Sequence, residues 1–189
     1  MIQTATVVEA LYYILTKIKR ADKIKLVKLI YLADKLHLLR YGRTITNDDY
    51  YAMENGPVGT TVKDVLSFDS FNITSSGYKY ASRLLKKIDK NNFEANPNAK
   101  VSFDMLSESD KGVLDFIIDK FGKMSQWKLV EYTHKYPEWY QYQDLFKEGL
   151  TRRERIETKE LLSTIKNDPL LVPKAHISES KKLLTGNFD

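Results

Sequence analysis

Residues 29–42 read LIYLADKLHLLRYG, and this stretch decides the fold. Leucine, isoleucine and tyrosine occur on every turn of the helix that the pattern predicts over residues 22–40. Asp22 is suited to cap the start of this helix, and Gly42 lies just past its end. A helix that is apolar almost all round is normally buried, so we expect it at the centre of the molecule.

Asp34 and His37 interrupt this apolar stretch. At about 100° per residue they lie about 60° apart on the helix surface, on the face that also carries Leu26, Val27 and Ile30. One interpretation is a general acid–base pair. The other is a polar clasp that fixes the following loop, since a buried charge needs a hydrogen-bonding partner. The sequence has no G-x-S-x-G elbow and no glycine-rich phosphate loop, so we favour the clasp.

The rest of the chain predicts a mainly α protein, close to all-α, with a compact helical domain and a small β-hairpin or short β element. We divide it into a helical domain over residues 1–150 and a C-terminal helical extension over residues 151–189, packed on or flanking that domain. The polar extension is the part expected to dock loosely. Further helices are predicted over 4–19, 59–66, 78–83, 107–122, 125–134, 138–146, 158–165 and 178–184, and short strands over 50–53 and on both sides of 90–92.

The composition excludes several kinds of site. The chain has 189 residues and no cysteine, so disulfides, thiolate zinc sites and a cysteine nucleophile are impossible. Its three histidines are isolated, at His37, His134 and His176, with no zinc-binding spacing. We therefore predict no metal, no cofactor and no catalytic residue. No stretch has the features of a signal peptide or a membrane span, which favours a soluble, cytoplasmic protein.

The net charge of +5 leaves two interpretations open. Basic residues gather at 17–28, 86–90 and 152–155, which could form a surface for nucleic acid or an acidic partner. The other interpretation, which we favour, is that lysines solubilise the outer faces of helices, because 25 acidic residues are interspersed with them.

The two tryptophans are interpreted differently. Trp127 shares a helical stripe with Val130 and His134 and is expected in the core. Trp139 lies in KYPEWYQY, where so many aromatic side chains are difficult to bury together. An exposed aromatic cluster favours a protein interface or base stacking, and a second small core remains the alternative.

Two sequence blocks resemble a known family. The segment KLIYLADKLHLLRYGRTITNDDYYAMENGPVGTTVKDVL fits the pattern K-L-[LI]-Y-x-A-[DQ]-x-x-H-x-x-x-x-G-R, followed by G-P-V and a short helix. This is similar to the signature of the Panacea domain, the SocA-like group also called phage-associated proteins. The matching residues are Lys28, Leu29, Tyr31, Ala33, Asp34, His37, Gly42, Arg43, Gly56, Pro57 and Val58.

The second block, LSESDKGVLDFIIDKFGKMSQWKLVEYTHKYPEW, is also similar to the family pattern, with Phe121 where a tyrosine is usual. Together the two blocks span roughly residues 5–165. The matching residues of the second block are Leu106, Ser107, Gly122, Ser125, Leu129, Thr133, His134 and Trp139.

The resemblance implies an antitoxin of a toxin–antitoxin system, with a role in phage defence. Members pair with unrelated toxins and neutralise them by direct binding, so it implies a hetero-oligomer with a toxin encoded by the adjacent gene. It implies no enzyme activity, no membrane association and little nucleic-acid binding by the chain alone.

On this basis we expect a partner-binding set around a rigid loop, with a structural set behind it. The partner-binding set is Tyr50, Tyr51, Met53, Glu54, Asn55, Pro57, Val58 and Trp139. The structural set is Tyr31, Asp34, His37, Gly42, Gly56 and His134. Two alternatives remain, a small basic nucleic-acid-binding regulator and a hydrolase that uses Asp34, His37 and His134.

Overall fold

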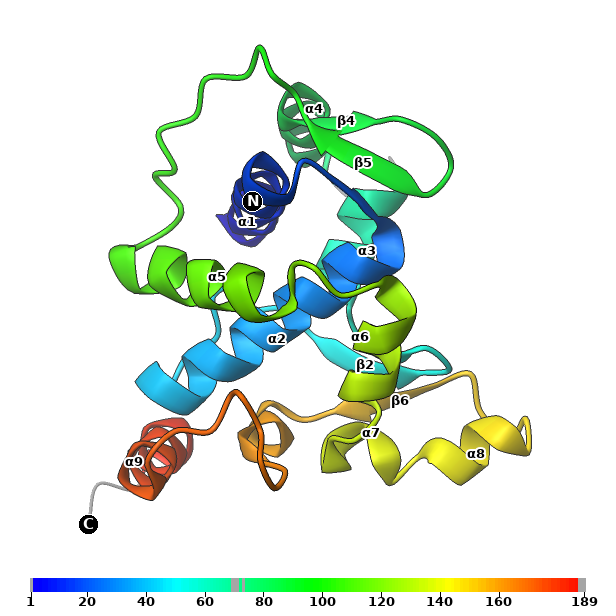
Figure 1. Ribbon diagram of the computed structural model, residues 1–189, viewed down its shortest axis with the longest axis vertical. Helices are drawn as coiled ribbons and strands as arrows, with labels where there is room; N and C mark the ends of the chain where they lie inside the picture. Colours follow the sequence, from blue (N-terminus) through cyan, green and yellow to red (C-terminus); the bar gives the residue numbers. More distant parts are fainter. Residues whose placement is uncertain (1, 69–71, 73, 187–189) are drawn as a thin grey trace.

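The computed structural model describes residues 2–68, 72 and 74–186. The chain is mostly helical, with two small three-stranded antiparallel sheets (Figure 1). The predicted fold class, mainly α with a small β element, is confirmed, but two sheets mean that the protein is not all-α. In the described part of the chain, no helix is long and apolar enough to cross a membrane.

The central element is α2 (Lys23–Tyr41), which the other helices surround in Figure 1. Its predicted ends are confirmed. The Asp22 carboxylate accepts a hydrogen bond from the Lys25 amide, and Gly42 closes the helix with a φ of 71°. Every side chain from Leu26 to Leu39 is buried, as expected for a central helix that is apolar almost all round. The buried side chains include those of two lysines.

The amino-terminal half packs on one end of α2. Helix α1 (Ile2–Ile18) contributes the apolar stripe predicted over residues 4–19, and it contacts α3 (Thr60–Ser67) and α4 (Ser75–Leu84). The predicted hairpin around residues 90–92 is present as β4 and β5. The first sheet has the order β1-β5-β4, with β1 (Arg20–Asp22), β4 (Leu85–Lys87) and β5 (Asn92–Ala95).

The second sheet has the order β3-β2-β6. Strand β2 (Tyr50–Met53) follows the loop after α2 and pairs antiparallel with β3 (Gly56–Gly59). The turn between them is at Glu54–Asn55, one residue earlier than an Asn-Gly-Pro turn would place it, because Gly56 and Pro57 are already part of β3.

The carboxyl-terminal half covers the other side of α2. The predicted capping box at Ser107 and Asp110 begins the next helix, because each side chain accepts the hydrogen bond of the other's amide. The single helix predicted over residues 138–146 is two short ones. The helices here are α5 (Glu108–Phe121), α6 (Gln126–Thr133), α7 (Pro137–Tyr140) and α8 (Gln143–Lys147).

Residues after 150 are built into the core. Strand β6 (Arg153–Ile156) pairs with β2, the 3-10 helix η1 (Thr158–Leu162) buries two leucines, and α9 (Lys174–Thr185) packs against α2. These contacts differ from the loose docking that we expected from the polar sequence. The chain needs this segment because β2 would otherwise present an unpaired edge.

Candidate functional site

The β2–β3 hairpin presents one outward row of side chains, which we call the hairpin surface. It consists of Tyr51, Met53, Glu54, Asn55 and Val58, all partly or fully exposed. Alternation along β2 explains the row, because successive side chains of a strand point to opposite faces. Five of the eight residues expected to bind a partner therefore lie together on one accessible surface, although their role in binding stays a prediction.

The other three residues of that set are buried. Tyr50 is inward on β2 and donates its hydroxyl to Asp34 Oδ2 at 2.8 Å. Pro57 is buried in β3, and its carbonyl accepts a hydrogen bond from Lys28 Nζ at 2.8 Å. Trp139 is only 4% exposed. These residues support the hairpin from behind.

The environments of the two tryptophans are the reverse of those expected. Trp127 is 55% exposed, because it lies in the first turn of α6, whereas the residues that this helix buries, Leu129, Val130 and Thr133, come later. Trp139 packs its ring on His134 at 3.5 Å between centroids and donates Nε1–H to the Met53 carbonyl at 2.7 Å. Of the two interpretations left open for Trp139, exposure was wrong and burial is what the structure has. Its indole N–H instead fixes the last residue of β2.

Gly56 allows the hairpin to lie close to the core. Its φ of 98° is in the region that favours glycine. A Cβ atom there would be 2.8 Å from Lys28 Nζ, 3.0 Å from Thr133 Oγ1 and 3.2 Å from the ring of His134. Larger residues would push the hairpin away from α2 and α6.

A cleft of about 640 Å³ opens beside the hairpin. Part of its wall is apolar, formed by Ile24, Val27, Met53, Val58 and Phe146. Such a volume is typical of small-ligand sites. Four cationic residues also line it, against a single carboxylate among the described lining residues, that of Glu54. The four are Lys23, Lys28, Lys63 and Arg152.

Lys28 is the unusual member of this group, because it is 1% exposed. Burial lowers the pKa of its ammonium to about 7. Nearby, burial and then the Lys28 charge lower the pKa of His134 to about 4. The Nε2 atom of His134 is buried and has no hydrogen-bond partner in the described part of the chain. Our expectation that the lysines of residues 17–28 lie on outer helix faces was wrong for Lys28.

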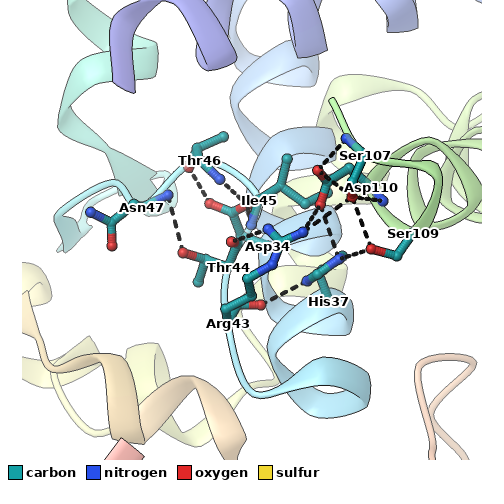
Figure 2. Close-up of polar contacts among 10 residues, drawn as sticks. All are labelled: Asp34, His37, Arg43, Thr44, Ile45, Thr46, Asn47, Ser107, Ser109 and Asp110. Atoms are coloured by element: carbon teal, nitrogen blue, oxygen red, sulfur yellow. Dashed lines mark hydrogen bonds and ion pairs between the residues drawn. The ribbon is translucent and has the colours of Figure 1, made fainter. Parts of the chain in front are cut away.

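Behind the hairpin, Asp34 holds the loop that follows α2 (Figure 2). Its Oδ1 accepts the amides of Ile45 at 2.9 Å and Thr46 at 3.0 Å. Its Oδ2 accepts the hydroxyls of Thr46 and Tyr50. Burial raises the pKa of Asp34 to about 6, although these hydrogen bonds oppose the increase. A carboxylate with four donors and no exposure fixes a backbone.

His37 holds the start of the same loop and ties it to α5 (Figure 2). Its Nδ1–H donates to the Arg43 carbonyl at 2.8 Å, and Nε2 lies 3.0 Å from Asp110 Oδ1 and 3.1 Å from Ser109 Oγ. Burial alone would raise the pKa of Asp110. The hydrogen bonds from His37 and Ser107, together with the Arg43 charge, outweigh it and lower the pKa to about 2.

A further buried cluster was missed by the sequence analysis. Lys35 Nζ donates to Glu138 Oε1 at 2.6 Å, and both side chains are fully buried. Tyr31 donates its hydroxyl to the same oxygen at 2.6 Å, and Ser163 donates to Oε2. The sequence did hold a signal for buried lysines. Lys28 and Lys35 lie two turns apart on a helix whose other residues are mostly apolar.

The residues considered for catalysis are not assembled into a reactive centre. Asp34 and His37 bond separate parts of the loop, and His134 lies beside the hairpin, against Trp139. Within the described ranges, no group of three histidine, aspartate or glutamate residues could hold a metal ion. The arrangement is that of a rigid support for an exposed hairpin with a cationic cleft beside it.

Comparison with known proteins identifies a family. The family model described as "Antitoxin SocA-like, Panacea domain" matches residues 26–140, which is more than half of the chain. No curated protein and no solved structure matches the chain. The matched range includes α2 from Leu26 onward, both strands of the hairpin, the clasp formed by Asp34 and His37, and Trp139.

Proposed function

The chain belongs to the SocA-like antitoxin family with the Panacea domain, and we propose that it neutralises a cognate protein toxin by binding it directly. The toxin is expected to be encoded by the adjacent gene and to form a hetero-oligomer with this chain in the cytoplasm. Direct neutralisation requires no catalytic residue of the antitoxin. It requires a surface that is ready to bind.

The observation that carries the proposal is the hairpin surface on its rigid support. Met53 is held through its carbonyl by Trp139, and Pro57 through its carbonyl by Lys28. Strand β6 pairs with β2 from the other side. A preformed surface binds at a smaller entropic cost than a loop that must first become ordered.

The composition of the hairpin surface suits a protein partner. Tyr51 and Met53 offer large, polarisable side chains, and Arg153 lies over the Tyr51 ring with its guanidinium carbon 5.2 Å from the ring centroid. Tyrosine, methionine and arginine are enriched in protein interfaces. Glu54 and Asn55, at the tip, supply polar groups for the rim.

The first test is a rescue experiment in cells. The adjacent gene is expressed alone and together with this chain, and growth is measured. We expect growth arrest in the first case and rescue in the second. The tagged chain should also capture the toxin in stoichiometric amount, at moderate salt and with nuclease present.

Met53→Glu should abolish rescue and capture, because it introduces a charge at the centre of the hairpin surface. Met105→Glu is the matched control, because Met105 is 38% exposed and lies outside the hairpin surface. Both variants must keep the thermal midpoint of the parent protein. A harmless neighbouring gene, or equal rescue by both variants, would contradict the proposal. Capture of no protein partner, with nucleic acid recovered when nuclease is left out, would favour the regulator.

A further inference from the structure

We propose that the cleft beside the hairpin is a binding site for a small organic anion, in which one carboxylate or phosphate head is joined to an apolar body. The head would lie against Lys28, and the body along the apolar wall. The cleft shares Met53, Glu54, Asn55 and Val58 with the hairpin surface, but the inference does not rest on toxin binding, because the site would remain if the toxin bound elsewhere.

Lys28 is the reason to expect an anion. Its side chain is buried, and within the described part of the chain its ammonium has one hydrogen bond, to the Pro57 carbonyl, and forms no ion pair with a carboxylate. The other buried lysine of α2, Lys35, has Glu138 at 2.6 Å. A buried cation without a counter-ion is costly, and an anion in the cleft would supply the missing partner.

The other charged residues in and beside the cleft strengthen the preference for negative charge. Lys23 lies on the same helix, and Lys63 on α3. Arg152 precedes β6, and His134 lies at the end of α6, where its Nε2 has no partner among the described residues. Glu54 at the hairpin turn is the opposing carboxylate, and it is exposed to solvent, which screens its charge.

The rest of the cleft sets the class of ligand. A volume of about 640 Å³ is far larger than a phosphate or carboxylate ion needs. Ile24, Val27 and Val58 provide aliphatic wall, and Phe146 an aromatic ring. An inorganic ion would leave this surface wet, whereas a flat or aliphatic body would cover it and gain the free energy of apolar burial.

The test uses a matched pair of probes, 2-naphthoate and its neutral analogue 2-naphthalenemethanol, which share the ring system. Affinities of the full-length protein are measured by calorimetry at pH 6.5 and pH 9.5, with inorganic phosphate as a third probe. At pH 6.5 we expect naphthoate to bind at least about tenfold more tightly than the alcohol, since a hydrogen bond between charged groups is worth that much. Phosphate should bind more weakly than naphthoate, because it has no apolar body to cover the wall of the cleft.

The preference for the anion should decrease at pH 9.5, because Lys28 then loses its proton. The preference that remains is the contribution of the other cationic residues of the cleft. In the variant Lys28→Met the preference at pH 6.5 should fall to the level that the parent protein has at pH 9.5. Lys86→Met, at an exposed lysine of β4, should change neither value.

A second measurement does not depend on any variant. The side-chain resonances of Lys28 and the amide resonances of Met53, Asn55 and Val58 are followed by NMR during the naphthoate titration. We expect both sets to shift and the pKa of Lys28 to rise. Equal affinity for naphthoate and the alcohol at pH 6.5, or Lys28 resonances that do not change on saturation, would overturn the proposal. Neither result would alter the rescue experiment, so the two proposals fail separately.

Discussion

Replacing Lys28 with methionine should stabilise this protein at neutral pH. The methionine side chain is also long and unbranched, so it can occupy the same space between α2 and the hairpin without a charge. What it removes is a buried ammonium with a single hydrogen bond, to the Pro57 carbonyl.

The magnitude follows from the pKa of Lys28, which is about 7 in the folded protein against 10.5 for a free lysine. The unfolded chain binds more protons than the folded protein between these values, so this group lowers stability most below pH 7 and less as the pH rises. Its cost is ~4 kcal/mol at pH 7 and ~1.4 kcal/mol at pH 9.5. In the variant the Pro57 carbonyl loses its donor, and this unpaired carbonyl lowers the stability of the variant by about 1–3 kcal/mol, which offsets part of the gain.

We therefore expect Lys28→Met to raise the free energy of unfolding at pH 7 by about 1–3 kcal/mol, and to lower it slightly or leave it unchanged at pH 9.5. Urea unfolding of both proteins at several values of pH gives the difference directly. The difference in the free energy of unfolding between Lys28→Met and the parent protein should change by ~3 kcal/mol between pH 7 and pH 9.5. For Lys86→Met the difference should not depend on pH. A difference for Lys28→Met that does not depend on pH would refute the idea that the lysine is buried and readily deprotonated.

Substitutions at Asp34, Lys35 and Gly56 test the buried contacts behind the hairpin, each by urea unfolding. Asp34→Ala should cost ~3 kcal/mol or more, because it leaves four donors unpaired. Asp34→Asn should cost less. In the parent protein the raised pKa of Asp34 makes the folded state bind more protons than the unfolded chain, so stability falls as the pH rises from 4 to 6, and Asp34→Asn should remove this fall. Lys35→Met should cost ~3–5 kcal/mol by leaving Glu138 unpaired, and adding Glu138→Gln should recover part of this. Gly56→Ala should cost ~1–3 kcal/mol, because φ is 98° and a Cβ would crowd Lys28. Variants that unfold at the parent's urea concentration would contradict these roles.

The sequence predicted the elements that local signals define. Asp22 and Gly42 mark the ends of α2 because capping depends on residues within one turn. The capping box at Ser107 and the β4–β5 hairpin follow from equally short patterns. The family resemblance was confirmed over residues 26–140.

What the sequence did not predict depends on distant partners. Strand β6 reads RERI, which has no apolar alternation, and it is a strand only because β2 offers its edge. Lys35 is buried because Glu138, far along the chain, provides a counter-ion. The positions of Trp127 and Trp139 depend on how α6 and α7 lie against α2, which periodicity within one helix cannot determine.

The pairing of β2 with β6 also has a consequence for protein synthesis. Met53 pairs with Arg153, so the ribosome makes the two edges of this contact a hundred residues apart. A nascent chain that ends near residue 150 has the β2–β3 hairpin but lacks β6. It also has Lys35 and Glu138 but lacks the Leu161 carbonyl and the Ser163 hydroxyl, which complete their hydrogen bonds. Such fragments expose an open edge and are targets for proteolysis. The hairpin is therefore paired on both sides only after the ribosome has passed residue 156.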